Sequence, residues 1–407
     1  MADPVSPLAP PGGFPDLPPV AGVRMASIAA GVRYTGRADV MLAVMDPGTA
    51  MAGVFTRSAT RAAPVLDCEA KIGQSGAEGA AILVNAGNAN AFTGTRGVDA
   101  VTAITGQVAA ATGVPEARVF TASTGVIGEP LPHDRITGAL GDLVQNLDPG
   151  SIAGAAQAIM TTDTFPKGAG HQVEIGGKTV TISGIAKGSG MIAPDMATML
   201  VFIFTDAQIA RPELQAMVAR LNAQTFNCIT VDGDTSTSDT LLVAATGQSG
   251  VDVAGEPAFE TALHAVMRDL AHLVVRDGEG ASKFVTVEVS GAADDADAHK
   301  AGLAIANSPL VKTAIAGEDP NWGRVVMAVG KSGAAADRDC LSIRFGDVLV
   351  AENGWVSPSY READAAAHMK RDEITIAVDL GIGAGTATVW TCDLTARYIE
   401  INADYRS

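Results

Sequence analysis

The chain has 407 residues and a formal net charge of -17, because 28 Lys and Arg face 45 Asp and Glu. With 47% hydrophobic and 18% charged residues, it has enough apolar material for one large core or two smaller ones. The negative charge repels phosphate backbones and anionic lipid headgroups, so we expect neither nucleic acid nor a membrane as a partner. No stretch of 18 or more residues is free of both charged residues and proline, which argues against a membrane span. The N-terminus lacks a basic region followed by an apolar one, so we expect a cytoplasmic protein.

The cysteines and histidines indicate no metal centre. Four cysteines lie more than 50 residues apart without a CxxC pair, and the six histidines form no cluster. Such spacing predicts neither a disulfide scaffold nor a zinc site. We therefore expect reduced, mostly buried thiols and no metal.

The first 20 residues form a proline-rich leader. They contain seven prolines, which lack backbone donors and favour extended geometry, so we expect the leader to lie on the surface without helix or strand. From Val23 onward, short β-type runs alternate with longer helical patterns, which is typical of an α/β protein.

Two helices have clear apolar periodicity. The first ends at Gly113-Val114-Pro115, a capping glycine followed by proline, and carries an apolar stripe of Val98, Val101, Ile104 and Val108. The second begins near Pro257 and ends at Arg276-Asp277-Gly278. Its stripe consists of Phe259, Leu263, Val266, Met267, Leu270, Leu273 and Val274.

Several segments alternate as strands do. Residues 172–175 and 178–182 flank Gly176-Gly177, a pattern that predicts a hairpin. Residues 284–289 and 374–378 alternate in the same way. Because hairpins imply antiparallel pairing, we expect stacked sheets covered by helices rather than a parallel Rossmann sheet.

A glycine-rich loop leads into a β-type run at the step from Ala197 to Thr198. Residues 188–193 match the GxGxxA dinucleotide fingerprint, but Pro194 and the following β-type run exclude the helix that this fingerprint needs. From spacing alone, Thr198 is an ordinary strand threonine below a tight turn.

The segment GIAKGSGMIAPDMATML, residues 184–200, resembles the signature of the ornithine acetyltransferase family, also called glutamate N-acetyltransferase, of the arginine pathway. The similarity runs from about Phe14 to the last residue. This resemblance implies an α/β fold, a four-layer αββα sandwich of the N-terminal-nucleophile type. Five further segments resemble family motifs in the same order: residues 81–94, 123–128, 160–164, 276–280 and 318–324.

The resemblance implies that one precursor cuts itself between Ala197 and Thr198. The products would be an α chain, residues 1–197, and a β chain, residues 198–407, in a heterotetramer of two α and two β chains. Thr198 would be the nucleophile, activated by its own freed α-amine, whose pKa is near 8. Such a site needs no histidine.

The resemblance also implies the other site residues. Thr124 through its hydroxyl and Gly125 through its N–H would stabilise the oxyanion. Thr162 is the alternative to its neighbour Thr161. The match at the C-terminus suggests that the tail folds back over the site. The implied substrate contacts are Thr161, Lys187, Thr198, Glu279, Asn402 and Ser407. Lys187 and Glu279 supply the two opposite charges that an amino-acid substrate requires.

The implied activity is a ping-pong acetyl transfer from N²-acetylornithine to glutamate through acetyl-Thr198, in cyclic arginine biosynthesis. We expect no bound cofactor. The residues do not separate family members that use acetylornithine alone from those that also use acetyl-CoA. Two alternatives stay open: a self-processing aminopeptidase or amidase of the same fold, in which water takes the acyl group, and a non-enzymatic amino-acid-binding module that does not need the Ala197-Thr198 step.

Overall fold

The computed structural model describes residues 4–74, 76–193 and 199–403. They form two compact units of mixed α/β structure, which confirms the predicted fold class. The larger unit comprises Pro10–Asn227 and Asp234–Val274, without the gaps named above. The smaller unit comprises residues 4–9, 228–233 and 275–403 of the described chain.

The larger unit contains two sheets. The first has the order β1-β2-β4-β5, and its strands are β1 (Val23–Ile28), β2 (Val40–Met45), β4 (Ala80–Asn88) and β5 (Val119–Val126). The second has the order β3-β9-β8-β7-β6, and its strands are β3 (Ala50–Phe55), β9 (Thr240–Ala245), β8 (Leu200–Thr205), β7 (Lys178–Lys187) and β6 (Lys167–Ile175). The pairs β4–β5 and β8–β9 are parallel, and the other pairs are antiparallel.

The two sheets of the larger unit pack face to face, as the predicted sandwich requires. Ile82 and Phe120 of the first sheet share one apolar core with Phe202 and Leu242 of the second. Helices α1 (Ala63–Lys71) and α5 (Ile152–Ala158) contribute Cys68, Ile152, Ala155, Ala156 and Ala158 to this core.

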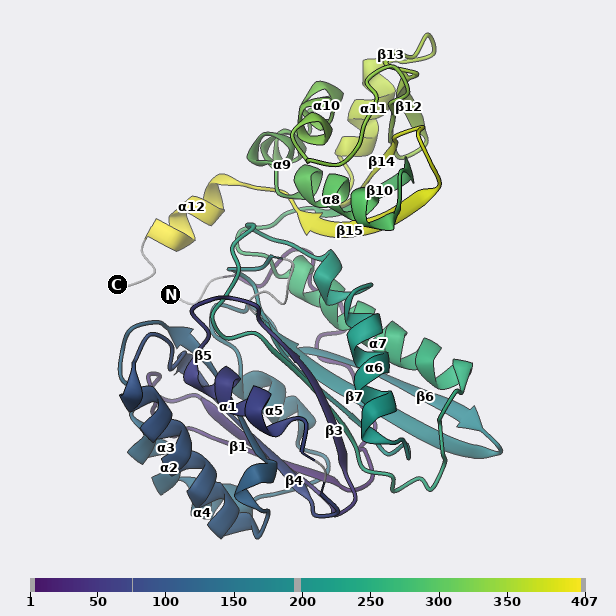
Figure 1. The fold of residues 1–407 in the computed structure, drawn as a ribbon. Helices are drawn as coiled ribbons and strands as arrows, with labels where there is room; N and C mark the ends of the chain where they lie inside the picture. Colours follow the sequence, from purple (N-terminus) through teal and green to yellow (C-terminus); the bar gives the residue numbers. More distant parts are fainter. Residues whose placement is uncertain (1–3, 75, 194–198, 404–407) are drawn as a thin grey trace. The chain divides into compact units, whose positions relative to one another are not determined.

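Helices cover the outer faces of both sheets (Figure 1). The first sheet packs against α2 (Thr95–Thr112), α3 (His133–Gly138) and α4 (Leu140–Gln145). The second sheet packs against α6 (Arg211–Asn222), where Gln215 bonds both backbone groups of Gly53, and against α7 (Pro257–Arg276) beside Gly184. The order helix, sheet, sheet, helix gives the four layers.

Both predicted helices are present. Helix α2 ends at Gly113, whose left-handed φ of 76° caps it as expected. Val101, Ile104 and Val108 are buried, but Val98 is 54% exposed, so its assignment to the stripe was wrong. At about 100° per residue, Val98 lies about 90° from the mean direction of the other three.

The predicted hairpin is β6–β7, which pairs antiparallel with Ile175 opposite Lys178. Gly176 and Gly177 have φ values of 60° and 77°, the left-handed pair that a two-residue turn of this kind requires. Both strands are longer than predicted, and β7 continues to Lys187. The hairpin therefore carries Lys187 to the far end of the sheet.

The smaller unit has one sheet of order β13-β12-β11-β14-β10-β15. Its strands are β13 (Trp355–Val356), β12 (Val348–Glu352), β11 (Ser342–Phe345), β14 (Glu373–Asp379), β10 (Phe284–Ala292) and β15 (Gly385–Cys392). Its helices are α8 (Asp295–Ala306), α9 (Pro309–Ala316), α10 (Trp322–Gly330), α11 (Glu362–Met369) and α12 (Ala396–Ala403). Residues of α8 to α11 share an apolar core with this sheet.

The sheets are mixed rather than purely antiparallel. Strands β10 and β14, both predicted, pair parallel, although most of the strand pairs are antiparallel. Hairpin signals are local, whereas parallel neighbours are joined by long crossovers that leave no local signal. The sandwich accounts for the larger unit only, and the sheet of the smaller unit is additional.

The leader contributes to both units. Residues 4–20 contain no helix or strand, but Leu8 and Val20 are buried, and Ser183 donates a hydrogen bond to the Pro18 carbonyl at 2.8 Å. The leader is therefore packed rather than merely draped on the surface. Within the described residues, no helix has the length and hydropathy to cross a bilayer.

Candidate active site

The predicted site residues that the structure describes are divided between the two units. The larger unit carries Thr124, Gly125, Thr161 and Lys187, and the smaller unit carries Glu279 and Asn402. Ala197, Thr198 and Ser407 lie outside the described residues.

Lys187, the last residue of β7, connects the two sheets of the larger unit. Its side chain is only 3% exposed, and its ammonium donates to Thr161 Oγ1 at 2.8 Å and to Thr124 Oγ1 at 3.3 Å. Thr124 belongs to β5 in the first sheet, whereas Lys187 belongs to the second. A hydroxyl that accepts from an ammonium keeps its own hydrogen for another acceptor. The Thr124 O–H can therefore donate to a further acceptor.

Gly125 follows Thr124 where β5 passes very close to β4. It lies opposite Gly87 in the parallel register and has a φ of 131°. A Cβ at position 125 would lie 2.2 Å from the Gly87 carbonyl carbon, which no side chain allows. Glycine is thus required beside Thr124.

Asp163 ties together the segments that carry Thr161 and Lys187. Its fully buried carboxylate accepts from Lys167 Nζ and from the Gly188 N–H through Oδ1, both at 2.6 Å. Oδ2 accepts from the Thr161 N–H at 3.0 Å and lies 3.8 Å from Lys187 Nζ. Sequence reasoning did not single out Asp163 or Lys167. The available signal was an Asp and a Lys four residues apart in a segment without other charges.

Charge fixes the protonation state of Asp163. Burial opposes ionisation, but the attraction of Lys167 and then Lys187, together with hydrogen bonds, lowers the pKa of Asp163 below its usual range. The carboxylate is therefore ionised at neutral pH. Two ammonium groups and one carboxylate give these three groups a formal charge of +1, which attracts an anion.

The two neighbouring threonines have different partners. Thr161 accepts from Lys187, whereas the Thr162 hydroxyl pairs with Ser189 Oγ at 2.7 Å. The structure therefore places Thr161 in the hydrogen-bond network of Lys187 and Thr124.

In the smaller unit, Glu279 and Asn402 are paired. Asn402 on α12 donates through Nδ2 to Glu279 Oε2 at 2.8 Å and to the Tyr398 carbonyl at 3.0 Å. Gly280 has a φ of 72°, and a Cβ there would lie 2.6 Å from the Tyr398 nitrogen. This glycine lets α12 approach the Glu279 segment closely.

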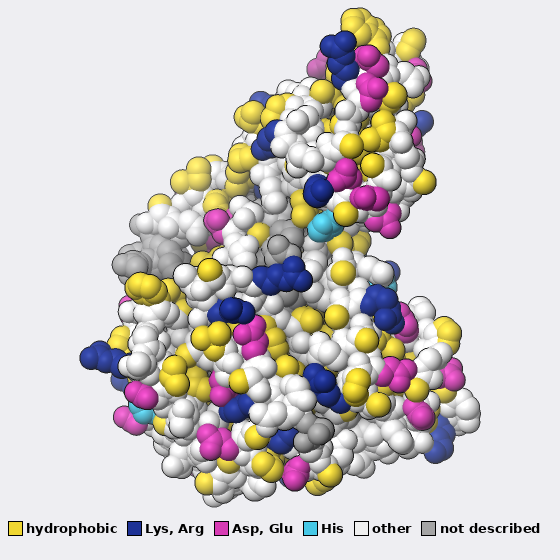
Figure 2. Space-filling view, viewed as in Figure 1, with side chains coloured by type: hydrophobic (Ala, Val, Ile, Leu, Met, Phe, Trp, Pro, Cys, Tyr) yellow, Lys and Arg dark blue, Asp and Glu magenta, His cyan; other side chains and the backbone are white. Residues whose placement is uncertain are grey.

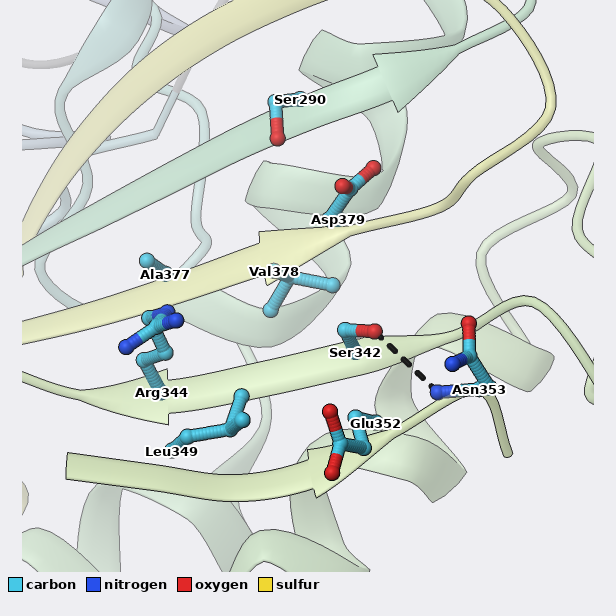
Figure 3. Close-up of a pocket in the computed structure, with 9 residues that line it drawn as sticks. All are labelled: Ser290, Ser342, Arg344, Leu349, Glu352, Asn353, Ala377, Val378 and Asp379. Carbon is cyan, nitrogen blue, oxygen red and sulfur yellow. Dashed lines mark hydrogen bonds between the residues drawn. The ribbon is translucent and has the colours of Figure 1, made fainter. Parts of the chain in front are cut away.

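A separate pocket lies on the sheet of the smaller unit (Figure 3). The Asn353 N–H donates to Ser342 Oγ at 3.3 Å at one end of it. It contains none of the predicted site residues and is lined by Ser290, Ser342, Arg344, Leu349, Glu352, Asn353, Ala377, Val378 and Asp379.

The visible face carries charges of both signs, and the potential metal-binding side chains of the described residues are not grouped in threes. On the face shown in Figure 2, Lys and Arg side chains are scattered among Asp and Glu. Among residues 4–74, 76–193 and 199–403, no three His, Cys, Asp or Glu side chains are grouped so that they could hold a metal ion.

Comparison with known proteins identifies the family. The model of the ArgJ family matches residues 24–407. The chain belongs to the ArgJ family. Its relatives include the arginine biosynthesis bifunctional protein ArgJ of Ruegeria pomeroyi, 70% identical over 99% of this chain and 98% of that one. The protein of the same name from Agrobacterium fabrum is 54% identical over the full length of both chains. The resemblance read from six ordered motifs is thus confirmed.

Solved structures in the ArgJ family are also similar to this chain. The crystal structure of the Bacillus halodurans arginine biosynthesis bifunctional protein is 42% identical, with a TM-score of 0.49. The match covers 51% of this chain and 99% of the Bacillus halodurans chain.

We predict that Asp163→Asn strongly destabilises the larger unit. Removing one partner of a buried ion pair leaves Lys167 uncompensated, which typically costs about 3–5 kcal/mol of the free energy of unfolding. Because the folded pKa of Asp163 is lowered, its contribution is present above the unfolded pKa of about 3.9 and is lost as pH falls through the folded value. The difference in free energy of unfolding between the wild type and Asp163→Asn, measured by chemical denaturation, should therefore be constant from about pH 5 to 8. It should shrink below about pH 4. Asp297→Asn, which breaks an exposed pair with Lys300, is the control and should have a much smaller effect. Equal losses in the two variants would contradict the prediction.

Proposed function

We propose that this chain is a self-processing threonine acyltransferase that moves acetyl from N²-acetylornithine to glutamate. The observation that carries the proposal is the buried Lys187 ammonium, which holds the hydroxyls of Thr124 and Thr161 at the end of β7. The strand that follows β7 in the sequence is β8, and the segment between them contains Thr198. Membership of the ArgJ family, whose relatives are named arginine biosynthesis bifunctional proteins, supports the same reaction.

Self-cleavage would create the catalytic base. The Thr198 hydroxyl oxygen bonds the Ala197 carbonyl carbon, and its proton passes to the Thr198 nitrogen as the peptide C–N bond breaks. Water then hydrolyses the resulting ester. The products are the Ala197 carboxylate, the Thr198 hydroxyl and a free α-amine. That amine can take a proton from the neighbouring hydroxyl near neutral pH.

Acetyl transfer would repeat this attack on a bound substrate. The Thr198 oxygen attacks the acetyl carbonyl, its proton passes through the α-amine to the departing ornithine nitrogen, and acetyl-Thr198 is formed. The amino nitrogen of glutamate then attacks the carbonyl carbon of that ester, and the bond from this carbon to the Thr198 oxygen breaks. A proton passes from the glutamate nitrogen through the α-amine to the Thr198 oxygen, and N-acetylglutamate leaves. The oxyanion in both steps would accept from the Thr124 hydroxyl and the Gly125 N–H. Because Thr124 accepts from the Lys187 ammonium, its O–H is polarised and donates more strongly.

The charge of the site suits amino-acid substrates. The formal +1 charge of Asp163, Lys167 and Lys187 attracts a carboxylate, which ornithine and glutamate derivatives both carry. Glu279 and Asn402 remain proposed substrate contacts on the basis of the family motifs, as does Ser407. One pocket that accepts two similar amino acids in turn is what a ping-pong route requires.

We propose that the two fragments stay associated after cleavage. Lys187 of β7 lies opposite Leu200 of β8 in one antiparallel pair, and the proposed cut falls between these strands. The fragments would therefore share a sheet and a core. We further propose a heterotetramer of two α and two β chains in the cytoplasm, without bound cofactor. The name "bifunctional" of the relatives supports acetyl-CoA as a second acetyl donor. The hydrolase alternative is not favoured, because relatives of 54–70% identity are arginine biosynthesis proteins.

Processing is the first test of this function. Purified protein should give two fragments, residues 1–197 and 198–407, by intact mass, and they should co-elute in gel filtration. Thr198→Ala should remain one chain, because cleavage needs the hydroxyl, whereas Thr198→Ser keeps a hydroxyl and should still be cut. Cleavage of the alanine variant at the same bond would show that Thr198 does not cut the chain.

The oxyanion role is tested by Thr124→Ala. Turnover should fall about 10²-fold or more with little change in KM, since the bond forms mainly in the transition state. Thr121→Ala is a matched control on the same strand, because its buried hydroxyl makes no hydrogen bond within the described residues. The control should keep its turnover number. Unchanged turnover in Thr124→Ala would remove this residue from the mechanism.

The covalent intermediate is tested by mass spectrometry. Acetylornithine alone should add one acetyl group to the fragment 198–407, and glutamate added later should remove it. Acetyl-CoA alone should give the same label if it is a second donor. If transfer proceeds while acetylornithine leaves the fragment unlabelled, direct transfer must replace the ping-pong route.

A further inference from the structure

Asp239 is a buried carboxyl group beside the strand that follows the proposed cut. It directly precedes β9, is 0% exposed, and accepts from the Met199 N–H through Oδ1 at 2.8 Å. The Met199 nitrogen is the atom that joins Met199 to Thr198 in the chain. Asp239 is thus one hydrogen bond and one covalent bond away from the proposed nucleophilic residue.

The Asp239 carboxyl group accepts from the Met199 N–H just before the β7–β8 pairing begins. The Met199 carbonyl accepts from the Thr240 N–H at 3.2 Å, and the Asp239 carbonyl accepts from the Thr56 N–H at 3.1 Å. Pairing of β7 with β8 begins only at Leu200, so the Met199 N–H lies beyond that ladder. Asp239 supplies its acceptor. Both backbone groups of Met199 are therefore held by consecutive residues, Asp239 and Thr240.

The second carboxyl oxygen of Asp239, Oδ2, is buried and makes no hydrogen bond within the described residues. Burial raises the pKa of Asp239 well above its usual range, against the bond from Met199 and the attraction of Lys187. Burial therefore favours the protonated form of this side chain. A buried, incompletely bonded acid is destabilising, which points to a role beyond holding the fold.

A second aspartate makes the same kind of bond at the other end of β8. Asp206 follows Thr205, the last residue of that strand, and accepts from the Thr181 N–H at 2.8 Å. It is 7% exposed, and neither of its carboxyl oxygens is buried without a partner in the described structure. Asp206 thus provides a structural counterpart that is remote from Met199.

We propose that Asp239 is a positioning residue that fixes the Met199 peptide, and through it the nucleophile, for both self-cleavage and acetyl transfer. The inference rests on the proposed function of Thr198. Reacting atoms must be held near 3 Å with the correct orientation, so freedom of the adjoining peptide lowers the rate. The hydrogen bond from the Met199 N–H needs an acceptor oxygen at the position of Oδ1, but it does not depend on a charge on the side chain.

Two substitutions separate the acceptor from the charge. Asp239→Asn keeps an acceptor oxygen in a neutral group of the same shape, so cleavage and kcat should stay within about threefold of the wild type. Asp239→Ala removes the acceptor and should slow both by about 10-fold or more, as expected for the loss of a buried hydrogen bond. The KM for acetylornithine, measured on cleaved protein, should change little because Asp239 does not contact substrate. Asp206→Ala, the matched control, should retain the cleavage rate and kcat.

The outcomes distinguish this inference from the proposed function. Folded Asp239→Ala with wild-type cleavage and kcat would show that the bond to Met199 has no part in either reaction. An uncut but folded Asp239→Asn would show that a charged carboxylate is needed, and the positioning role would be wrong. The result for Asp239→Asn tests the positioning role even if Asp239→Ala does not fold. Cleavage of Thr198→Ala would instead contradict the proposed function itself.

Discussion

The candidate site depends on one buried ammonium group. Lys187 reaches from the second sheet of the larger unit to Thr124 in the first, and it bonds Thr161 on the way. A buried ammonium is tolerated only when anions and acceptors surround it, and Asp163 supplies the nearby negative charge. Because Asp163 also bonds Lys167 and two backbone amides, each contact limits the movement of the others. The charge network therefore sets the geometry at the end of β7, which precedes the segment that contains the proposed nucleophile.

Strand pairing and the shared core explain why the fold would survive the proposed cut in its backbone. The segment from 188 to 199 connects neighbouring strands of one sheet, whose register, Lys187 opposite Leu200, is maintained by ladder bonds and by the core between the sheets. Phe202 and Phe204 of β8 are fully buried in that core. Scission of the connecting segment would leave these interactions intact, since none of them passes through the cut bond. The compact units also do not follow the proposed boundary at 197/198, because the larger unit continues to Val274.

Local signals in the sequence predicted local structure well. The capping glycine at 113, the Gly176-Gly177 turn and the apolar stripe of α7 each depend on neighbours within a few residues, and all are present. Parallel pairing and the separate sheet of the smaller unit depend on contacts between distant segments, which periodicity does not encode. The motifs indicated Thr124 and Lys187, but not the acids that hold the site. The contacts of Asp163 with Gly188 and of Asp239 with Met199 arise only when distant segments of the chain meet in space.

The pKa values of these two buried acids are shifted in opposite directions. Asp163 has Lys167 at 2.6 Å and two backbone donors besides, so attraction outweighs desolvation and its pKa is lowered. Among the described residues, Asp239 accepts from one backbone N–H, that of Met199, and desolvation by burial outweighs this bond and the attraction of Lys187, so its pKa is raised. Asp163 can therefore balance the ammonium groups, whereas burial favours the protonated form of Asp239, in which Oδ1 still accepts from Met199. An ionised Asp239 would cancel the formal +1 charge of Asp163, Lys167 and Lys187 and weaken the attraction for a substrate carboxylate. The raised pKa of Asp239 thus favours the charge that the proposed site presents to its substrate.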